Sequence, residues 1–321
     1  MKRYLSALSL VSALIPTVVG GFFWPDVTNV FSFGDSYTDT YARLTDGKLS
    51  PPQDSKTTAG GPMWIEYLTS TYNVSHVNLF NFASISIIFI ISYGGAVTDQ
   101  NIIAQSSSAT QSFRDQVNNF LEYYANNSSL AQWNKNNTLF TIFFGINDIG
   151  KSFYWTNETV HRTNARVLAS YFEGLSLLRD AGAASFLLLE VPNVGRTPDL
   201  LKQGNNATLQ ARAADDYNKQ LASHVSEFRQ NSTRAGVDVN INIHSTNAFF
   251  DFILDNSGIL GFENVTGLSN EAQYSTATYF WWNNFHPTWG VHEVAATTLH
   301  GLLTSVVLLG HNYRELTVAQ Q

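Results

Sequence analysis

The feature that most constrains the fold of this chain is an alternation of short β-branched or aromatic runs with longer segments of helical periodicity. This alternation is typical of βαβ units wound around a parallel sheet. There is no internal repeat and no low-complexity linker, so we predict one α/β domain over residues 21–321. The five runs predicted as buried strands are Val27–Phe33, Val77–Ala83, Leu139–Phe144, Ser185–Val191 and Val237–Ile243.

Three further segments have the pattern of amphipathic helices. Apolar residues recur at helical spacing over residues 167–178, and Gly182 follows as a stop signal. A second series over residues 209–228, which begins at Leu209, keeps a four-residue step before Gly236. The last helix should begin near Gly290. These helices are expected to cover the faces of the sheet.

The composition restricts the chemistry before any motif is considered. The 321 residues include no cysteine, which excludes disulfides, thiolate metal sites and a cysteine nucleophile. The formal net charge is −7 and the charges do not gather in blocks, so there is no basic footprint for nucleic acid. Covalent and acid–base chemistry is therefore left to Ser, Thr, His, Asp, Glu, Lys or Tyr side chains.

The N-terminus has the charge and hydropathy order of a secretory signal. Lys2 and Arg3 precede an apolar stretch from Leu5 to Val19, with small residues beyond it. We expect a signal peptide over residues 1–20 and a secreted, extracellular protein. A stable membrane anchor is not expected, because the run is shorter than the about 20 residues that a bilayer span needs. Eight glycosylation sequons permit a secreted glycoprotein but add little, since roughly five are expected by chance.

The chemistry of a parallel sheet lies beyond the carboxyl ends of its strands. The first run leads into Gly34-Asp35-Ser36, which places a serine hydroxyl there. A serine needs a base, and His286, in a loop just before a helix, is the best candidate. Gly95, Asn147 and the N–H of Ser36 can donate to the oxyanion of an acyl-transfer intermediate. The alternative is that the triplet is a helix cap and Asn147 an ordinary turn residue.

Several blocks resemble those of the GDSL (SGNH) hydrolase family. They are Phe33-Gly34-Asp35-Ser36-Tyr37-Thr38-Asp39, Gly95-Ala96, Gly145-Ile146-Asn147-Asp148 and His286-Pro287. The segments 61–64 and 191–196 are similar to the fungal, secreted branch that includes carbohydrate-esterase family sixteen. Together these blocks span residues 31–294, nearly the whole predicted mature chain.

The resemblance implies a flavodoxin-like three-layer α/β/α sandwich with a five-stranded parallel sheet. It implies an acetyl or short-chain ester hydrolase that uses no metal and no cofactor. In this family pattern Ser36 is the nucleophile, His286 is the base, and Ser36, Gly95 and Asn147 form the oxyanion hole.

The chain departs from the family pattern at two places. Asn283 stands three residues before the histidine, where many members have an aspartate. We predict a Ser-His dyad that Asn283 assists by accepting a hydrogen bond from the imidazole. The apolar run 84–92 also looks inserted before Gly95, and three interpretations remain open: an extension of the second strand, a hydrophobic flap, or an error in the sequence.

Aromatic residues lie beside every one of these blocks. Tyr37, Trp64 and Trp282 could stack on sugar rings, although large aromatics also fill cores and pocket walls. The polar segment Thr45–Pro62 is the best candidate for a substrate-facing rim. Asp39 and Asp148 are expected to hold the loops of the site rather than to bind a metal.

Together with this resemblance, these observations predict a secreted serine esterase that removes acetyl groups from hemicellulose-derived sugars. Its partners would be small-molecule or oligosaccharide esters, with no nucleic acid. Two alternatives remain: a lipase or phospholipase-like hydrolase of longer acyl chains, and a catalytically weak carbohydrate-binding protein. No Gly-x-Ser-x-Gly, His-Glu-x-x-His, Gly-x-Gly-x-x-Gly or P-loop motif is present.

Overall fold

The computed structural model describes residues 24–318, except 54–55, 73–76, 84–94, 106, 108–109, 127–128 and 272–277. The predicted signal peptide and the apolar run 84–92 therefore lie outside the described residues.

Five parallel strands form the central sheet, in the order β4-β1-β5-β6-β7. In chain order this is 2-1-3-4-5, the flavodoxin-like order that was expected. All five predicted strands are confirmed, with small shifts at their ends. They are β1 (Asn29–Gly34), β4 (Asn78–Asn81), β5 (Thr138–Phe143), β6 (Ser185–Leu189) and β7 (Asn240–His244).

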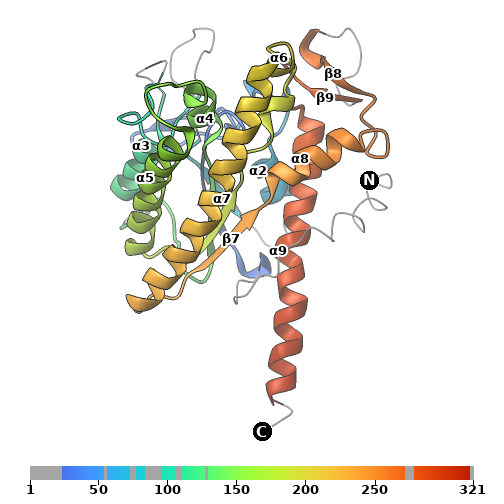
Figure 1. Cartoon of the computed structure of the whole chain (residues 1–321). Helices are drawn as coiled ribbons and strands as arrows, with labels where there is room; N and C mark the ends of the chain where they lie inside the picture. The colour runs from blue at the N-terminus through green and yellow to red at the C-terminus, as the bar shows by residue number, and fades with distance from the viewer. Residues whose placement is uncertain are drawn as a thin grey trace.

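Helices cover both faces of this sheet, so the domain has three layers (Figure 1). Because side chains alternate along a strand, neighbouring residues enter different cores. Phe31 joins the core under α3, α5 and α7, whereas Val30 joins the core under α2, α8 and α9. The bounds are α2 (Trp64–Glu66), α3 (Phe113–Tyr123), α5 (Val160–Asp180), α7 (Asn205–Arg234), α8 (Thr246–Asp255) and α9 (Trp289–Val318).

The predicted helices are confirmed and end where the glycines indicated. Gly182 follows α5 with φ +109° and Gly236 follows α7 with φ +74°, a left-handed conformation that favours glycine. One expected core position is wrong: Leu209, in the first turns of α7, is exposed, because the buried face of that helix begins at Gln210 and Ala213. No helix in the described part of the chain combines the length and the hydropathy that a membrane span requires.

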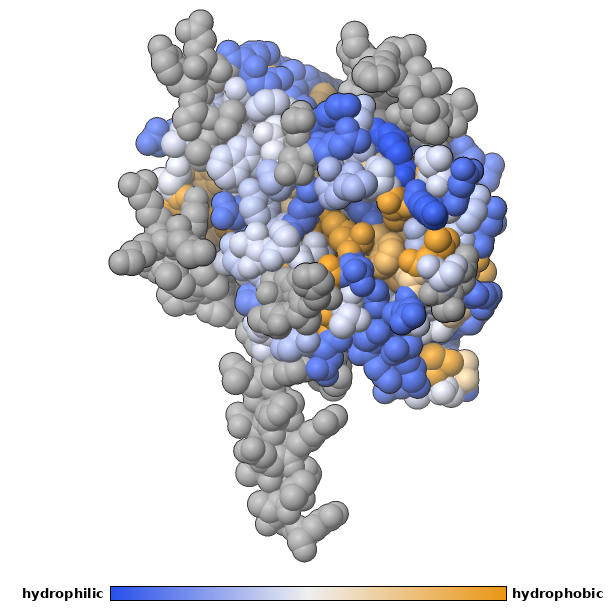
Figure 2. Space-filling view, turned by 180° about the vertical axis from the view of Figure 1, so that it is seen from behind, coloured by the Kyte–Doolittle hydropathy of each residue, from blue (hydrophilic) through white to orange (hydrophobic). Residues whose placement is uncertain are grey.

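Two small sheets were not predicted from the sequence. β2 (Leu44–Thr45) and β3 (Lys48–Leu49) form a hairpin, and β8 (Asn264–Leu268) pairs with β9 (Tyr279–Trp281). Their strands are too short or too irregular to show a periodic pattern of hydrophobic residues in the sequence. Figure 2 shows the surface from behind, where hydrophilic residues predominate and the visible hydrophobic ones gather near the middle.

The strand order fixes where the site lies. The direction of chain winding reverses between β1 and β5, and such a switch point leaves a crevice at the carboxyl ends of those strands. The loop with Ser36 follows β1. The short helix α4 (Ile146–Ser152), which carries Asn147, follows β5.

Candidate active site

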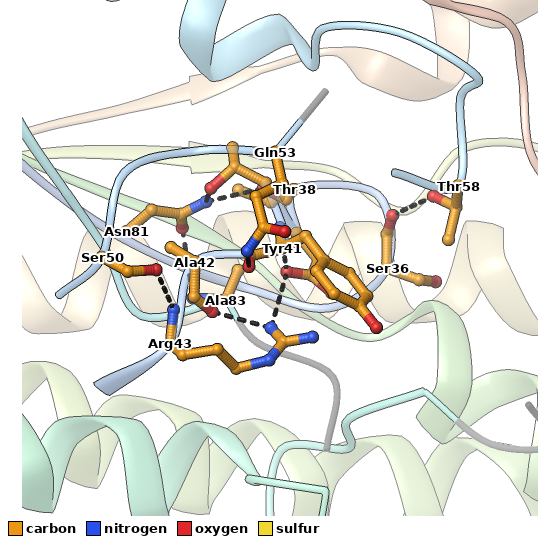
Figure 3. Close-up of polar contacts among 12 residues, drawn as sticks. Ser36, Thr38, Tyr41, Ala42, Arg43, Ser50, Gln53, Thr58, Asn81 and Ala83 are labelled. Carbon is orange, nitrogen blue, oxygen red and sulfur yellow. Dashed lines mark hydrogen bonds and ion pairs between the residues drawn. The ribbon is translucent and has the colours of Figure 1, made fainter. Parts of the chain in front are cut away.

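Ser36 lies in a tight turn directly after β1. The carbonyl of Asp35 accepts hydrogen bonds from the N–H groups of Thr38 and Asp39. The hydroxyl of Thr58 donates to the carbonyl of Ser36 at 2.5 Å, which ties the distant segment 56–58 to this turn (Figure 3). The serine is thus held by its backbone, while its hydroxyl remains available for another partner.

That partner is His286, which comes from the loop before α9. Its Nε2 lies 2.7 Å from the Ser36 Oγ, and its Nδ1 lies 3.0 Å from the Asn283 Oδ1. The same Asn283 oxygen accepts the backbone N–H groups of Phe285 and His286, each at 2.9 Å. An amide oxygen can only accept from Nδ1, so the proton sits on Nδ1 and the lone pair of Nε2 faces the serine.

The surroundings of His286 favour its neutral form. Burial lowers the pKa of His286 from 6.5 to about 4, because a charged imidazolium loses its hydration there. In the part of the chain that the structure describes, no carboxylate contacts the ring to oppose this effect, since Asn283 occupies that place. A neutral imidazole is the form that can take a proton from a hydroxyl.

Tyr37 connects the serine turn to the histidine loop. Its hydroxyl donates a hydrogen bond to the carbonyl of Phe285, and its ring centroid lies 5.3 Å from that of His286. Tyr37 directly follows the serine in sequence, so one side chain fixes two loops that are some 250 residues apart. This contact was not anticipated from the sequence, where Tyr37 was considered only for substrate binding.

Two residues expected to donate to an oxyanion, Gly95 and Asn147, lie against each other, and Asn147 is bonded to Asp35 in the turn that carries Ser36. A Cβ at Gly95 would lie 2.5 Å from the Asn147 Nδ2, so only glycine permits this close approach. Among the described residues, no acceptor is within hydrogen-bond distance of the backbone N–H of Ser36 or Gly95. As far as the described residues show, both N–H groups can donate to a developing negative charge.

The amide of Asn147 is differently placed. Its Nδ2 donates to the Asp35 Oδ2 at 3.0 Å and to the Ala96 carbonyl at 3.1 Å, which uses both of its hydrogens. To serve an oxyanion it must share or give up one of these bonds. Burial raises the pKa of Asp35 to about 7, opposed by the Tyr37 N–H and the Asn147 amide, which favour its charged form.

Two other carboxylates hold the loops, as the sequence indicated. Asp148 accepts from the N–H and the hydroxyl of Thr98, which joins the Asn147 helix to the segment after Gly95. Burial raises the pKa of Asp148 to about 6. Asp39 accepts the N–H of Tyr41 at 2.7 Å. The described residues include no group of three or more His, Cys, Asp or Glu that could hold a metal ion.

The aromatic residues expected to stack on sugars require a correction. Tyr37 is 3% exposed and Trp64 is 2% exposed, so neither presents a ring face to solvent. The indole N–H of Trp64 instead donates to the Thr38 hydroxyl. Trp282 is half-buried, with Gly60 packed against its ring, and Phe285 is 47% exposed beside the histidine. The sequence gives no signal that separates these environments.

Comparison with known proteins identifies the relatives of this arrangement. The model of the family "GDSL-like Lipase/Acylhydrolase" matches residues 30–299. An acetylesterase from Thermothelomyces thermophilus is 31% identical over 276 residues, which cover 83% of this chain and 85% of that protein. A thermolabile hemolysin from Vibrio parahaemolyticus is 26% identical over 298 residues, covering 85% of this chain and 63% of the hemolysin.

Solved structures also resemble this chain. An acetyl xylan esterase from Geobacillus stearothermophilus is 14% identical, with a TM-score of 0.44 and coverage of 87% of this chain and 96% of that one. A member of the lipolytic G-D-S-L family from Veillonella parvula is 13% identical, with a TM-score of 0.46 and coverage of 87% and 99%.

Proposed function

Because this chain belongs to the GDSL-like lipase/acylhydrolase family and is a carboxylic ester hydrolase, we propose that it removes acetyl groups from hemicellulose-derived sugars through a Ser-His acyl-enzyme mechanism. The observation that carries the proposal is the 2.7 Å contact between the Ser36 Oγ and the His286 Nε2. A hydroxyl and a neutral imidazole at this distance form a nucleophile with its base.

In the acylation step the Ser36 Oγ attacks the ester carbonyl while the His286 Nε2 takes the hydroxyl proton. The negative charge that develops on the carbonyl oxygen is met by the N–H groups of Ser36 and Gly95, with Asn147 as a third donor. Collapse of this intermediate breaks the bond to the sugar oxygen, which receives the proton from His286. The sugar leaves and an acetyl group remains on Ser36.

In the deacylation step water takes the place of the sugar. The water oxygen attacks the acetyl carbonyl while His286 accepts a proton from the water. The same donors stabilise the second oxyanion. Collapse returns the proton to the Ser36 Oγ and releases acetate. Asn283 assists both steps by keeping the imidazole proton on Nδ1, a role that requires its side-chain oxygen and not a charge.

The acetyl specificity is supported by the relative that is 31% identical and is an acetylesterase. Secretion is also part of the proposal and is supported by the N-terminal sequence, where Lys2 and Arg3 precede the apolar stretch. N-terminal sequencing of the protein recovered from a host's culture medium tests this. A secreted chain should begin near Gly21, and retention of the protein in the cells with Met1 intact would contradict it.

The central experiment measures acetate released from acetylated xylo-oligosaccharides by the purified protein and by its Ser36→Ala and His286→Ala variants. Each variant should lose at least about 10³-fold in kcat, and the double variant little more, because the two groups act as one unit. Equal hydrolysis by wild type and Ser36→Ala, with glycan binding retained, would instead favour a carbohydrate-binding protein. A series of nitrophenyl esters of increasing acyl length separates an acetylesterase from a lipase.

A further inference from the structure

Tyr41, five residues after the serine, has an unusual backbone. Its φ of +58° lies in the left-handed region, which costs free energy for a residue with a side chain. Two contacts hold it there: its N–H donates to the Asp39 Oδ1 at 2.7 Å, and its carbonyl accepts from the Gln53 Nε2 at 3.4 Å. The chain thus maintains a strained backbone conformation at Tyr41.

Two cationic side chains gather on the Tyr41 ring. The Arg43 guanidinium carbon lies 3.8 Å from the ring centroid, and the Lys56 ammonium lies 5.2 Å from it. Each contact is a cation–π interaction, and together they bring two positive charges to one place. Figure 3 shows Arg43 beside the Tyr41 ring.

Nearby negative charge balances only part of the positive charge of Arg43 and Lys56. The Asp39 Oδ1 lies 4.0 Å from the Arg43 guanidinium. One of its nitrogens donates to the Ala42 carbonyl. Among the described residues, no carboxylate lies within 4.0 Å of the Lys56 ammonium, which is exposed. Counted over the described residues, the cluster therefore has positive charge to offer to a ligand.

Two segments of the chain connect this cluster to the turn that carries Ser36. Tyr41 follows Ser36 in the same loop, and Lys56 lies two residues before Thr58, whose hydroxyl donates to the Ser36 carbonyl. In Figure 3 the phenol end of Tyr41 points to the side on which Ser36 lies. Lys56 also belongs to the segment 45–62 that was predicted to face the substrate.

From this placement we propose that Tyr41, Arg43 and Lys56 form a subsite that binds an anionic group on the alcohol part of the ester. The inference rests on the proposed function, because it assumes that Ser36 attacks an ester bound beside this cluster. An Arg fork and a Lys ammonium are both suited to a carboxylate or a phosphate. Two sources share that chemistry: the carboxylate of an acetylated uronic acid and the phosphate of an acylated glycerol.

The experiment compares two pairs of acetate esters that differ in charge. The first pair is the methyl glycoside of O-acetylated galacturonic acid and that of O-acetylated galactose, which differ by one carboxylate. The second pair is diacetylglycerol phosphate and triacetylglycerol. For each pair the ratio of kcat/KM on the anionic ester to that on the neutral ester is measured, at low and at high salt.

The wild type should prefer the anionic member of at least one pair, and the pair that shows the preference identifies the source. Lys56→Gln should reduce that ratio about fivefold, as expected for one exposed charge pair. Lys56→Arg should retain the ratio. Added salt should lower it in the wild type, because exposed charges are screened. Lys219→Gln, an exposed lysine on α7, is the matched control and should change nothing.

Ratios near one for both pairs, in the presence of Ser36-dependent hydrolysis, would overturn the subsite and leave the proposed function intact. A ratio that Lys56→Gln and Lys219→Gln lower equally would also overturn it, because the effect would then be one of net charge. Absence of Ser36-dependent hydrolysis of every ester would overturn both proposals. Arg43→Gln is a second test of the same ratio, because it removes the guanidinium charge while the Lys56 ammonium remains.

Discussion

Replacement of Asn283 by aspartate should move the acid limb of the activity profile to higher pH. In the wild type, burial holds the pKa of His286 at about 4, and an imidazole is a base only above its pKa. The acid limb of kcat/KM should therefore lie near pH 4. The new carboxylate would replace an oxygen that is 3.0 Å from the His286 Nδ1, with almost no change in shape.

The size of the expected pKa shift follows from the interaction of two charges in direct contact. Two opposite charges about 4 Å apart interact by roughly 4 kcal/mol at an effective dielectric constant of about 20, and such neighbours shift pKa values by about 1–3 units. The carboxylate would stay ionised, because the same oxygen accepts the N–H groups of Phe285 and His286. The acid limb of Asn283→Asp should thus appear between about pH 5 and pH 7.

The assay is kcat/KM for 4-nitrophenyl acetate from pH 3 to pH 9 at constant ionic strength. Asn118→Asp, which adds the same charge at an exposed position of α3, controls for net charge and should leave the acid limb in place. Asn283→Ala should lower kcat because no side chain then holds the proton on Nδ1. An acid limb that stays at the same pH in Asn283→Asp would refute this reasoning. Full activity of both Asn283 variants would refute the assisting role.

Three further substitutions test other parts of the site and fold. Tyr37→Phe keeps the ring but loses the hydrogen bond to the Phe285 carbonyl, so kcat should fall about tenfold with KM unchanged, whereas a change in KM alone would argue against a positioning role. Gly95→Ala places a Cβ 2.5 Å from the Asn147 Nδ2 and should lower kcat about 10²-fold; normal turnover would show that Asn147 and Gly95 do not act together. Gly145→Ala should destabilise the protein by about 1–3 kcal/mol in urea unfolding, because φ is +120° and the new methyl group meets side chains from the β6 loop and α7. An unchanged unfolding midpoint would contradict this packing.

Much of the site was accessible from the sequence because its parts are local. Ser36 and Asn147 each follow a buried strand, and strand runs are recognisable by their apolar residues. Parallel strands end at one edge, so residues after neighbouring strands come together. The distances between Ser36, His286 and Asn283 agree with the roles expected for them, which remain to be tested by substitution.

Other features depend on contacts that no local pattern encodes. The sequence shows an aromatic residue at Tyr37 and at Trp64, but their burial depends on helices contributed from the other end of the chain. The same holds for the amide hydrogens of Asn147, whose acceptors come from the loops after β1 and before α3.

The sequence by itself determined the order of strands and helices and the side chains that line the carboxyl edge of the sheet. It could do so because hydrophobic period, glycine stops and loop residues are properties of short segments. Only the tertiary structure decided which of these side chains touch, which are buried and how their pKa values change. Those properties depend on desolvation and on atoms brought within about 3 Å from distant parts of the chain. The strained Tyr41 with its two cations is such a product of the folded state.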